Sequence, residues 1–472
     1  MEPSVPLANL AILPTEILTM ILLETNDIDT LGRWCLYYKP AAAICQDDRF
    51  WKQKYRKDYG EILFPNDAKQ DQPKISWKRR YKLTTKTLRS NSPISAGLNH
   101  YGVIDQNGVL YMAGENRHGQ LGNGSNIEVD LQNPIMIPFK SKVISISCYD
   151  NTTATVTEDG KVYYWGGETE TIHRPREAKI LPKAVKVSVS LSRDGNITII
   201  IIGRDNLVYF WSQGKKKYDR ISVLPKEHQS QPVLISSSKE IKTVPIVAIN
   251  IIQNNETLAI IDLDGNLYLE GRIPGTYEYN NDDGYLDYFE GKRIFGFTHF
   301  PLPEPIKQVS LGDDHIAVLT ITGRIYSWGT DHPIQQSQDI SEINKPKDKM
   351  GWTFKDKISY IAAGNYLTAF ITESGGLYIW GDNLYQQITN SRNKIVSSGN
   401  DPPDRDHHCL EHSLVLLPTL FGIRFPVNYI DFGDKFTIAV TNDGAINLWG
   451  TIQPKTTISP LPHDFLLSFE DI

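Results

Sequence analysis

Cysteine is scarce in this sequence, with four residues in a chain of 472. The four lie far apart, without the regular spacing of a disulfide framework, at Cys35, Cys45, Cys148 and Cys409. Small secreted domains depend on such frameworks, so their absence suits a reducing compartment. We therefore expect the protein in the cytoplasm or the nucleus.

Long apolar runs are missing too. The stretch ITIIIIG at 197–203 is far shorter than the roughly 20 apolar residues that a membrane-spanning helix needs. The N-terminal residues lack the basic region and the long apolar region of a secretory signal peptide. We expect no contact with a membrane.

The chain also lacks an excess of positive charge. Its 49 Lys and Arg are outnumbered by 55 Asp and Glu, which gives a net charge of −6. Proteins that bind nucleic acid directly are usually basic, so we do not expect that activity. The 40% hydrophobic and 22% charged content is that of a soluble globular protein, and the length predicts two domains or a repeat array.

One short motif recurs along the chain, a turn followed by a strand that often ends in tryptophan and glycine. It occurs seven times, as NGVLYMAG (107–114), DGKVYYWG (159–166), DNLVYFWS (205–212), DGNLYLEG (264–271), TGRIYSWG (322–329), SGGLYIWG (374–381) and DGAINLWG (443–450). Six of the seven second turn residues are glycine and the other is Asn206, the exchange expected where the backbone needs a positive φ. An alternating apolar stretch, such as TATVT (153–157), precedes the turn, which predicts a β-hairpin in each repeat.

Other strands flank these hairpins. VISIS (143–147) precedes one of them, and the proline-containing segment NPIMIP (133–138) follows another. Four strands in repeats of this size are typical of propeller blades, so residues 89–472 are predicted to form an all-β, seven-bladed propeller. Either 457–465 or 80–88 could supply the outer strand that closes the ring. The tryptophans at one shared position of the repeat are expected to pack between blades: Trp165, Trp211, Trp328, Trp380 and Trp449.

The repeated pattern resembles that of the regulator of chromosome condensation repeat family, whose fold is a seven-bladed propeller. The first repeat carries the pattern most fully, in SAGLNHYGVIDQNGVLYMAGENRHGQLG (95–122). Repeats five and six keep parts of it, in LGDDHIAVL (311–319) and WGDNLYQQI (380–388), and the others lack the Gly-Gln-Leu-Gly tail. The resemblance extends over about residues 90–460.

Residues 1–88 have a different texture, with apolar residues at helical spacing. Pro14 suits a first helical turn, Asp27 or Asp29 can cap a second helix, and Asp47 or Asp48 can cap a third. Proline is expected to interrupt the helix at Pro40. This spacing predicts a small all-α unit, and SWKRRYKL (76–83) adds a short helix.

The helical segment resembles an F-box, although a plain helical cap on the propeller is the alternative. In that family the apolar positions bind the Skp adaptor of cullin-based ubiquitin ligases. The resemblance implies Skp-adaptor contacts for Leu13, Pro14, Ile17, Leu18, Ile21, Leu22, Leu31 and Trp51. The two resemblances together predict an F-box-like domain over residues 1–88 followed by the propeller over 89–472.

No residues in the chain form a recognisable catalytic set, and we expect neither an enzyme nor a cofactor. The most suggestive cluster is DRDHHCLEH (404–412), which holds metal-capable side chains. Adjacent histidines do not easily face one ion, and GNDPP (399–403) before them marks a surface loop. We therefore predict no metal site.

Two functions follow from the resemblances. The first is a substrate-recognition adaptor of a Skp/cullin/F-box type ubiquitin ligase, in which the propeller binds the target. The alternative is a guanine-nucleotide exchange factor, or scaffold, for a small Ran-like GTPase, which is the founding activity of the propeller family. Exchange works by binding the nucleotide-free GTPase, so neither function demands a catalytic side chain.

One segment stands out as a candidate target-binding loop, TYEYNNDDGYLDYFEG (276–291). It combines tyrosines, which give large contact areas, with carboxylates, which favour a basic target. Its alternative is an ordinary blade loop whose rings pack on the fold. The residues predicted to contact the target are Tyr277, Tyr279, Asp282, Asp283, Tyr285, Asp287 and Tyr288. Antiparallel connections should place this loop on one face with GLNH (97–100) and GDDH (312–315).

Overall fold

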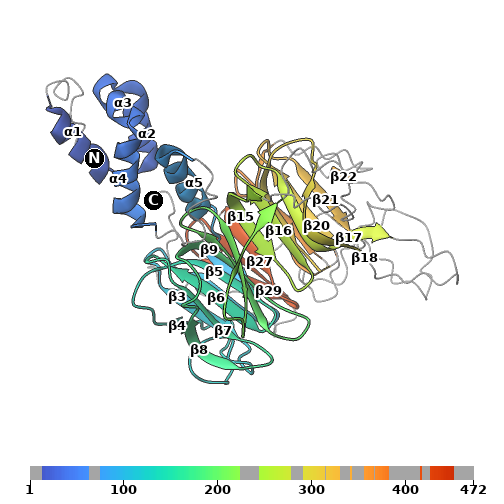
Figure 1. The fold of residues 1–472 in the computed structure, drawn as a ribbon. Coiled ribbons are helices and arrows are strands. Elements are labelled where there is room, and N and C mark those ends of the chain that lie inside the picture. The colour runs from blue at the N-terminus through green and yellow to red at the C-terminus, as the bar shows by residue number, and fades with distance from the viewer. Residues whose placement is uncertain are drawn as a thin grey trace, which may run out of the picture.

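The computed structural model describes residues 13–62, 75–223, 244–277, 291–313, 315–329, 341–342, 356–365, 367–381, 415–416 and 426–450. Within these ranges the N-terminal part is helical and the remainder consists of strands, arranged as seven antiparallel sheets around a centre (Figure 1). The predicted seven-bladed propeller is therefore confirmed.

The blades take their strands in chain order, and every neighbouring pair is antiparallel. Blades one to three are β1 (Ile94–Ala96), β2 (His100–Ile104), β3 (Leu110–Gly114), β4 (Ile135–Ile137); β5 (Val143–Tyr149), β6 (Thr152–Thr157), β7 (Val162–Gly166), β8 (Ile172–Glu177); and β9 (Ala184–Leu191), β10 (Ile197–Gly203), β11 (Val208–Ser212), β12 (Asp219–Arg220). Blades four and five are β15 (Ala248–Gln253), β16 (Thr257–Asp262), β17 (Leu267–Tyr277), β18 (Gly291–Phe300); and β19 (Ile306–Leu311), β20 (His315–Thr320), β21 (Ile325–Gly329), β22 (Ser341–Glu342). Blades six and seven are β23 (Ile358–Ala363), β24 (Leu367–Thr372), β25 (Leu377–Gly381), β26 (Val415–Leu416); and β27 (Val427–Phe432), β28 (Phe436–Thr441), β29 (Ile446–Gly450). A separate pair, β13 (Ser222–Val223) and β14 (Val244–Pro245), lies between blades three and four in the chain.

The recurring motif is the hairpin between the second and third strands of each blade. All seven second turn residues have positive φ, between 64° and 87°, and the non-glycine member is Asn206. This backbone region is open to glycine and tolerated by asparagine, which explains the residues found there. The seven predicted hairpins are confirmed.

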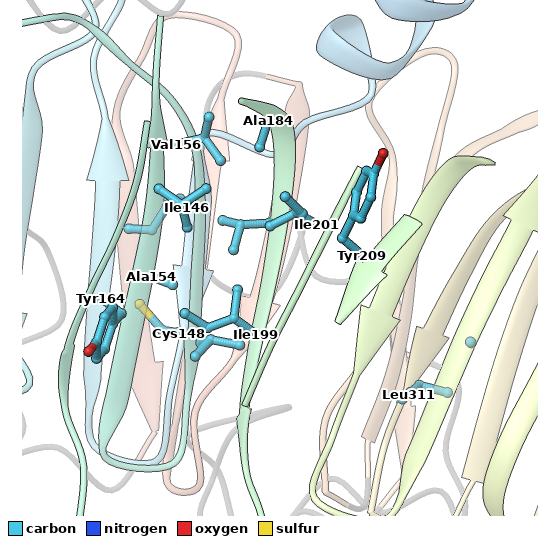
Figure 2. Packing of buried hydrophobic residues seen from close by; sticks show 14 of the residues in the cluster. Ile146, Cys148, Ala154, Val156, Tyr164, Ala184, Ile199, Ile201, Tyr209 and Leu311 are labelled. Carbon is cyan, nitrogen blue, oxygen red and sulfur yellow. The ribbon is translucent and has the colours of Figure 1, made fainter. Parts of the chain in front are cut away.

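Neighbouring blades pack through aliphatic side chains. Ala154 and Val156 of β6 lie opposite Ile199 and Ile201 of β10, and Ile146 of β5 joins the same cluster (Figure 2). Burying each large aliphatic side chain contributes about 1.5–3 kcal/mol, so these interfaces hold the ring together.

The Gly-Gln-Leu-Gly tail of repeat one joins blade one to blade two. The backbone carbonyl of Gln120 accepts hydrogen bonds from Trp165 Nε1 at 2.8 Å and Thr153 Oγ1 at 2.9 Å. Gly122 lies against the same indole, where a Cβ would come within 2.8 Å of Trp165 Nε1. The expected packing of tryptophans between blades is confirmed for Trp165, Trp211 and Trp449, which are all buried.

Blade seven closes directly onto blade one. Asp431 of β27 accepts a hydrogen bond from the Ala96 amide of β1 at 2.8 Å, and the Asp434 amide donates to the Leu98 carbonyl at 2.8 Å. Residues 80–88 belong to a helix, so their use as a closing outer strand was a wrong alternative. The other alternative, 457–465, lies outside the described residues.

Five helices precede the propeller in the described residues: α1 (Thr15–Glu24), α2 (Ile28–Tyr37), α3 (Lys39–Gln46), α4 (Asp48–Tyr59) and α5 (Trp77–Arg89). Asp27 caps α2 by accepting from the Asp29 and Thr30 amides, and Asp47 caps α4 by accepting from the Arg49 amide. The predicted interruption at Pro40 is confirmed, since α2 ends before it and Pro40 lies in the first turn of α3.

A disulfide joins Cys35 of α2 to Cys45 of α3, with a Cα–Cα distance of 5.7 Å. The sequence showed no paired cysteine framework, and this bond corrects that interpretation. The helix break before Pro40 turns α3 back against α2, which brings together two cysteines ten residues apart. Spacing alone did not reveal the turn.

The helices dock on blade three. Tyr55 Oη donates to the Arg204 carbonyl, and Arg80 Nη1 donates to the Asp205 carbonyl. Asn206 completes the contact by donating from Nδ2 to Thr84 Oγ1 at 3.2 Å. The second-to-third-strand turn of blade three is therefore the seat of α4 and α5.

Candidate partner-binding face

The antiparallel connections give the propeller two different faces. The turns between second and third strands lie on one face, which carries the helices and is called the helical face here. The turns between first and second strands and the loops between third and fourth strands lie on the opposite, distal face. The predicted placement of GLNH (97–100) and GDDH (312–315) on one face is confirmed, because both follow a first strand.

Hydrogen bonds link the distal turns of neighbouring blades. The Leu98 amide donates to the Asp150 carbonyl at 3.0 Å, and Asn254 Nδ2 donates to the Gly312 carbonyl at 3.0 Å. Asn365 Nδ2 reaches Asp434 Oδ1 at 3.2 Å. These bonds tie turns from separate blades into a preorganised platform, which reduces the entropic cost of binding a partner.

An acidic cluster lies around Tyr149 at the distal end of β5. Burial raises the pKa of the Tyr149 phenol, and the charges of Asp313, Asp150 and Glu256 raise it further. These residues come from blades two, four and five, so the fold brings together side chains that are more than 100 residues apart.

Two carboxylates of this cluster, those of Asp150 and Glu256, have different surroundings. Asp150 has a φ of 47°, unusual for a non-glycine residue, and burial together with Glu168 raises the pKa of its carboxyl. Glu256 forms ion pairs with Arg272 at 2.8 Å and Arg193 at 3.4 Å. Burial by itself would raise the pKa of Glu256, but the hydrogen bonds and charges of Arg272 and Arg193 together lower it.

Sequence reasoning missed this cluster as a unit. Its signal was the repeated Asp and Asn residues that follow the first strand, as in CYDN (148–151), IQNNE (252–256) and GDD (312–314). Each occurrence looks like ordinary turn chemistry. Only ring closure shows that these turns converge.

The buried titratable groups have structural roles. Burial lowers the pKa of His100 to about 3, and its Nε2 lies 2.9 Å from Thr153 Oγ1. Burial raises the pKa of the free Cys148 thiol to about 12, which makes it unreactive. Among the described residues no cluster of His, Cys, Asp and Glu could hold a metal ion, and no helix is long and apolar enough to cross a membrane.

Of the eight residues predicted to bind a Skp adaptor, some are buried in the helical unit and others are exposed. Four of them, Leu18, Leu22, Leu31 and Trp51, are buried in its core. Leu13 and Ile21 are half-buried, and Pro14 and Ile17 are exposed. Half of the residues predicted to contact the adaptor are therefore core residues of the helical unit.

The predicted target-binding loop is almost wholly outside the described residues. Tyr277 is the last residue of β17, and its backbone pairs with Gly291 of β18. The other members, Tyr279, Asp282, Asp283, Tyr285, Asp287 and Tyr288, lie outside the described residues, as does the 404–412 cluster. Their predicted roles stay predictions.

Comparison with known proteins identifies the repeats. Residues 107–156, and residues 306–332 with 358–387, match two descriptions of the Regulator of chromosome condensation (RCC1) repeat. The chain carries regulator of chromosome condensation repeats.

Curated proteins share these repeats. Protein pim1 of Schizosaccharomyces pombe is 25% identical over 349 residues, which cover 72% of this chain and 54% of pim1. The X-linked retinitis pigmentosa GTPase regulator of Homo sapiens is 25% identical over 303 residues, 62% of this chain and 28% of that protein. The chain thus spans about half the length of pim1 and less of the GTPase regulator.

A solved structure of yeast RCC1 (Prp20) bound to Kap60 matches 73% of this chain and 79% of that chain. Its sequence identity is 17% and its TM-score is 0.47.

These findings correct the predicted function and partners. The relatives include the Regulator of chromosome condensation of Mus musculus and of Homo sapiens, and no F-box family match is found. The prediction of a Skp/cullin/F-box substrate adaptor is therefore wrong. The predicted Skp and cullin partners are wrong for the same reason. Short amphipathic helices with a leucine-proline start also arise in a small helical unit that buries its apolar face internally, as Leu18 and Leu22 do.

Proposed function

We propose that this protein regulates a small Ran-like GTPase, as an exchange factor or scaffold that binds the GTPase with its propeller. The similarity of the repeats to a named GTPase regulator over 62% of the chain carries the proposal. The founding activity of the family that the repeats resemble points to the same partner. We place this activity in the cytoplasm or the nucleus.

The distal face is the proposed docking surface. The helical face is occupied over blade three by Tyr55 and Arg80, whereas the distal turns form a linked platform with the acidic cluster near its centre. A protein acting by this route displaces nucleotide by binding the nucleotide-free GTPase. Nucleotide exchange of this kind does not require any propeller side chain to form or break a covalent bond. We therefore propose that the chain does not catalyse covalent chemistry.

Paired charge variants test the docking surface. Asp150→Asn with Asp313→Asn removes two charges from the distal face, while asparagine keeps the size and tolerates the φ of Asp150. We expect the variant to bind a nucleotide-free Ran-type GTPase about tenfold more weakly, chiefly through a slower association rate, measured by surface plasmon resonance.

The matched control removes two charges from the helical face. Asp159→Asn with Asp264→Asn changes turns of blades two and four by the same net charge. This control should bind like the unaltered protein. Equal loss of binding in both pairs would exclude the distal face as the docking surface.

A further inference from the structure

The centre of the propeller contains a cavity of about 130 Å³. The first strand of each blade lines it, and the linker Ser90–Ser92 after α5 contributes the helical-face side. Asn91 fixes this linker by donating from Nδ2 to the carbonyls of Ile144 at 2.9 Å and Val185 at 3.0 Å.

Lys186 of β9 is the only lysine or arginine among the residues that line this cavity. Its side chain is half-buried and makes no hydrogen bond or ion pair with any described residue. This partial desolvation lowers the pKa of its ammonium to about 8. A partly desolvated cation without a counter-charge is costly, so an anion in the cavity would relieve that cost.

Four serines line the same cavity, and the oxygen of each accepts a hydrogen bond from the backbone of the next blade. Ser145 Oγ accepts from the Val187 amide at 3.3 Å, Ser188 Oγ from the Gln253 amide at 3.0 Å, and Ser310 Oγ from the Ala363 amide at 2.9 Å. Each bond ties one blade to the next. Ser147 does the same with the Val189 amide at 3.0 Å.

These hydroxyls are oriented by the bonds that they accept. Each serine has one O–H donor, and no acceptor for that proton is found among the described residues for Ser145, Ser147, Ser188 or Ser310. The donors therefore remain available to the cavity that their residues line. Several hydroxyl donors and one ammonium form a lining suited to a ligand rich in acceptors.

Asp431 is the one carboxylate among the lining residues. Both its oxygens are engaged at the junction of blades seven and one, Oδ2 by the Ala96 amide at 2.8 Å and Oδ1 by the Phe432 amide at 2.9 Å. Asp431 is therefore held by the backbone, and no ion pair joins it to Lys186 across the ring.

We propose that the central cavity binds a small oxyanion, chemically like inorganic phosphate, between the Lys186 ammonium and the hydroxyls of Ser145 and Ser188. Ser188 lies on the same strand as Lys186, two residues further on, and Ser145 of the neighbouring blade is bonded to the adjacent Val187 amide. The cavity is too small for a nucleotide, whose sites usually measure about 300–1,000 Å³.

The test is calorimetric titration of the full chain with inorganic phosphate, against sodium chloride at equal ionic strength. The unaltered protein should bind one phosphate saturably. Lys186→Met should bind at least about tenfold more weakly, because it loses a charge-assisted hydrogen bond. Lys183→Met, an exposed lysine three residues earlier, is the matched control and should bind normally.

Sulfate and malonate distinguish a general oxyanion site from one selective for phosphate. Binding of any of the three that depends on Lys186 supports the proposal. No saturable binding of any of them, or equal binding by Lys186→Met, would overturn it, leaving water as the occupant.

A measurement on the unaltered protein avoids any effect of substitution on folding. Side-chain ¹⁵N NMR of Lys186 should show a higher pKa when the protein is saturated with phosphate, since an anion favours the charged amine. An unchanged pKa at saturating phosphate would contradict the proposal.

Discussion

His100 shows how one buried side chain ties stability to pH. Thr153 Oγ1 donates to the Gln120 carbonyl, so its oxygen is left to accept from His100 Nε2–H. Burial holds the pKa of the ring at about 3, so the ring is neutral in the folded protein at neutral pH. The unfolded chain binds a proton near pH 6.5, so this group's contribution to stability is present above pH 6.5 and is lost as pH falls towards 3.

Replacing this residue should flatten the acid side of the stability profile. Phe436 occupies the same strand position in blade seven, which makes His100→Phe a substitution that the repeat already uses. Between pH 7.5 and pH 5 the unaltered protein should lose about 2 kcal/mol more of its free energy of unfolding than the variant. Urea denaturation at both pH values measures the difference.

Other titrating groups are common to the two proteins and cancel in this comparison. Asp431, whose pKa burial raises to about 6, acts in the opposite direction in both. Equal pH dependence in the variant would show that His100 is not the group responsible.

At the scale of elements, the helices and blade three share hydrogen bonds that a free-standing helical unit would leave unmade. Tyr55 is fully buried, and burial raises the pKa of its phenol to about 12. Its hydroxyl donates to the Arg204 carbonyl, in the turn whose asparagine also binds α5.

Tyr55→Phe should therefore destabilise the docked helices. The change leaves the Arg204 carbonyl without this donor, at a cost of about 1–3 kcal/mol in the free energy of unfolding. Tyr37→Phe is the control, because Tyr37 is 84% exposed and its change should be neutral. Amide hydrogen exchange of α5 should accelerate in the first variant alone, and unchanged exchange would show that this bond does not hold the helices.

Elements with local signals could be predicted from the sequence, and elements set by distant contacts could not. The turns at Gly108, Gly160 and Asn206 follow from backbone conformation, and the caps at Asp27 and Asp47 from side-chain chemistry. The second role of Asn206, its bond to Thr84, had no signal because its partner lies 122 residues away.

At the scale of the whole molecule, the candidate site likewise depends on contacts between distant residues. Periodicity predicted seven blades, and alternation of connections predicted which turns share a face. The acidic cluster around Tyr149 and the cavity around Lys186 depend on ring closure through Asp431 and Ala96, which no local pattern encodes. The adaptor prediction was wrong for a related reason, since the apolar pattern that packs Leu18 and Leu22 internally also fits a surface bound by a partner.

The central claim is that the propeller binds a Ran-like GTPase. The most direct measurement is the release of a fluorescent guanine nucleotide from a purified Ran-type GTPase, with and without the full chain. For an exchange factor, the release rate should rise with the concentration of the chain and saturate. For a scaffold, the rate stays constant while the GTPase and the chain co-elute in gel filtration. The account would be contradicted if the chain neither accelerated nucleotide release nor formed a complex with the GTPase, in the presence or absence of nucleotide.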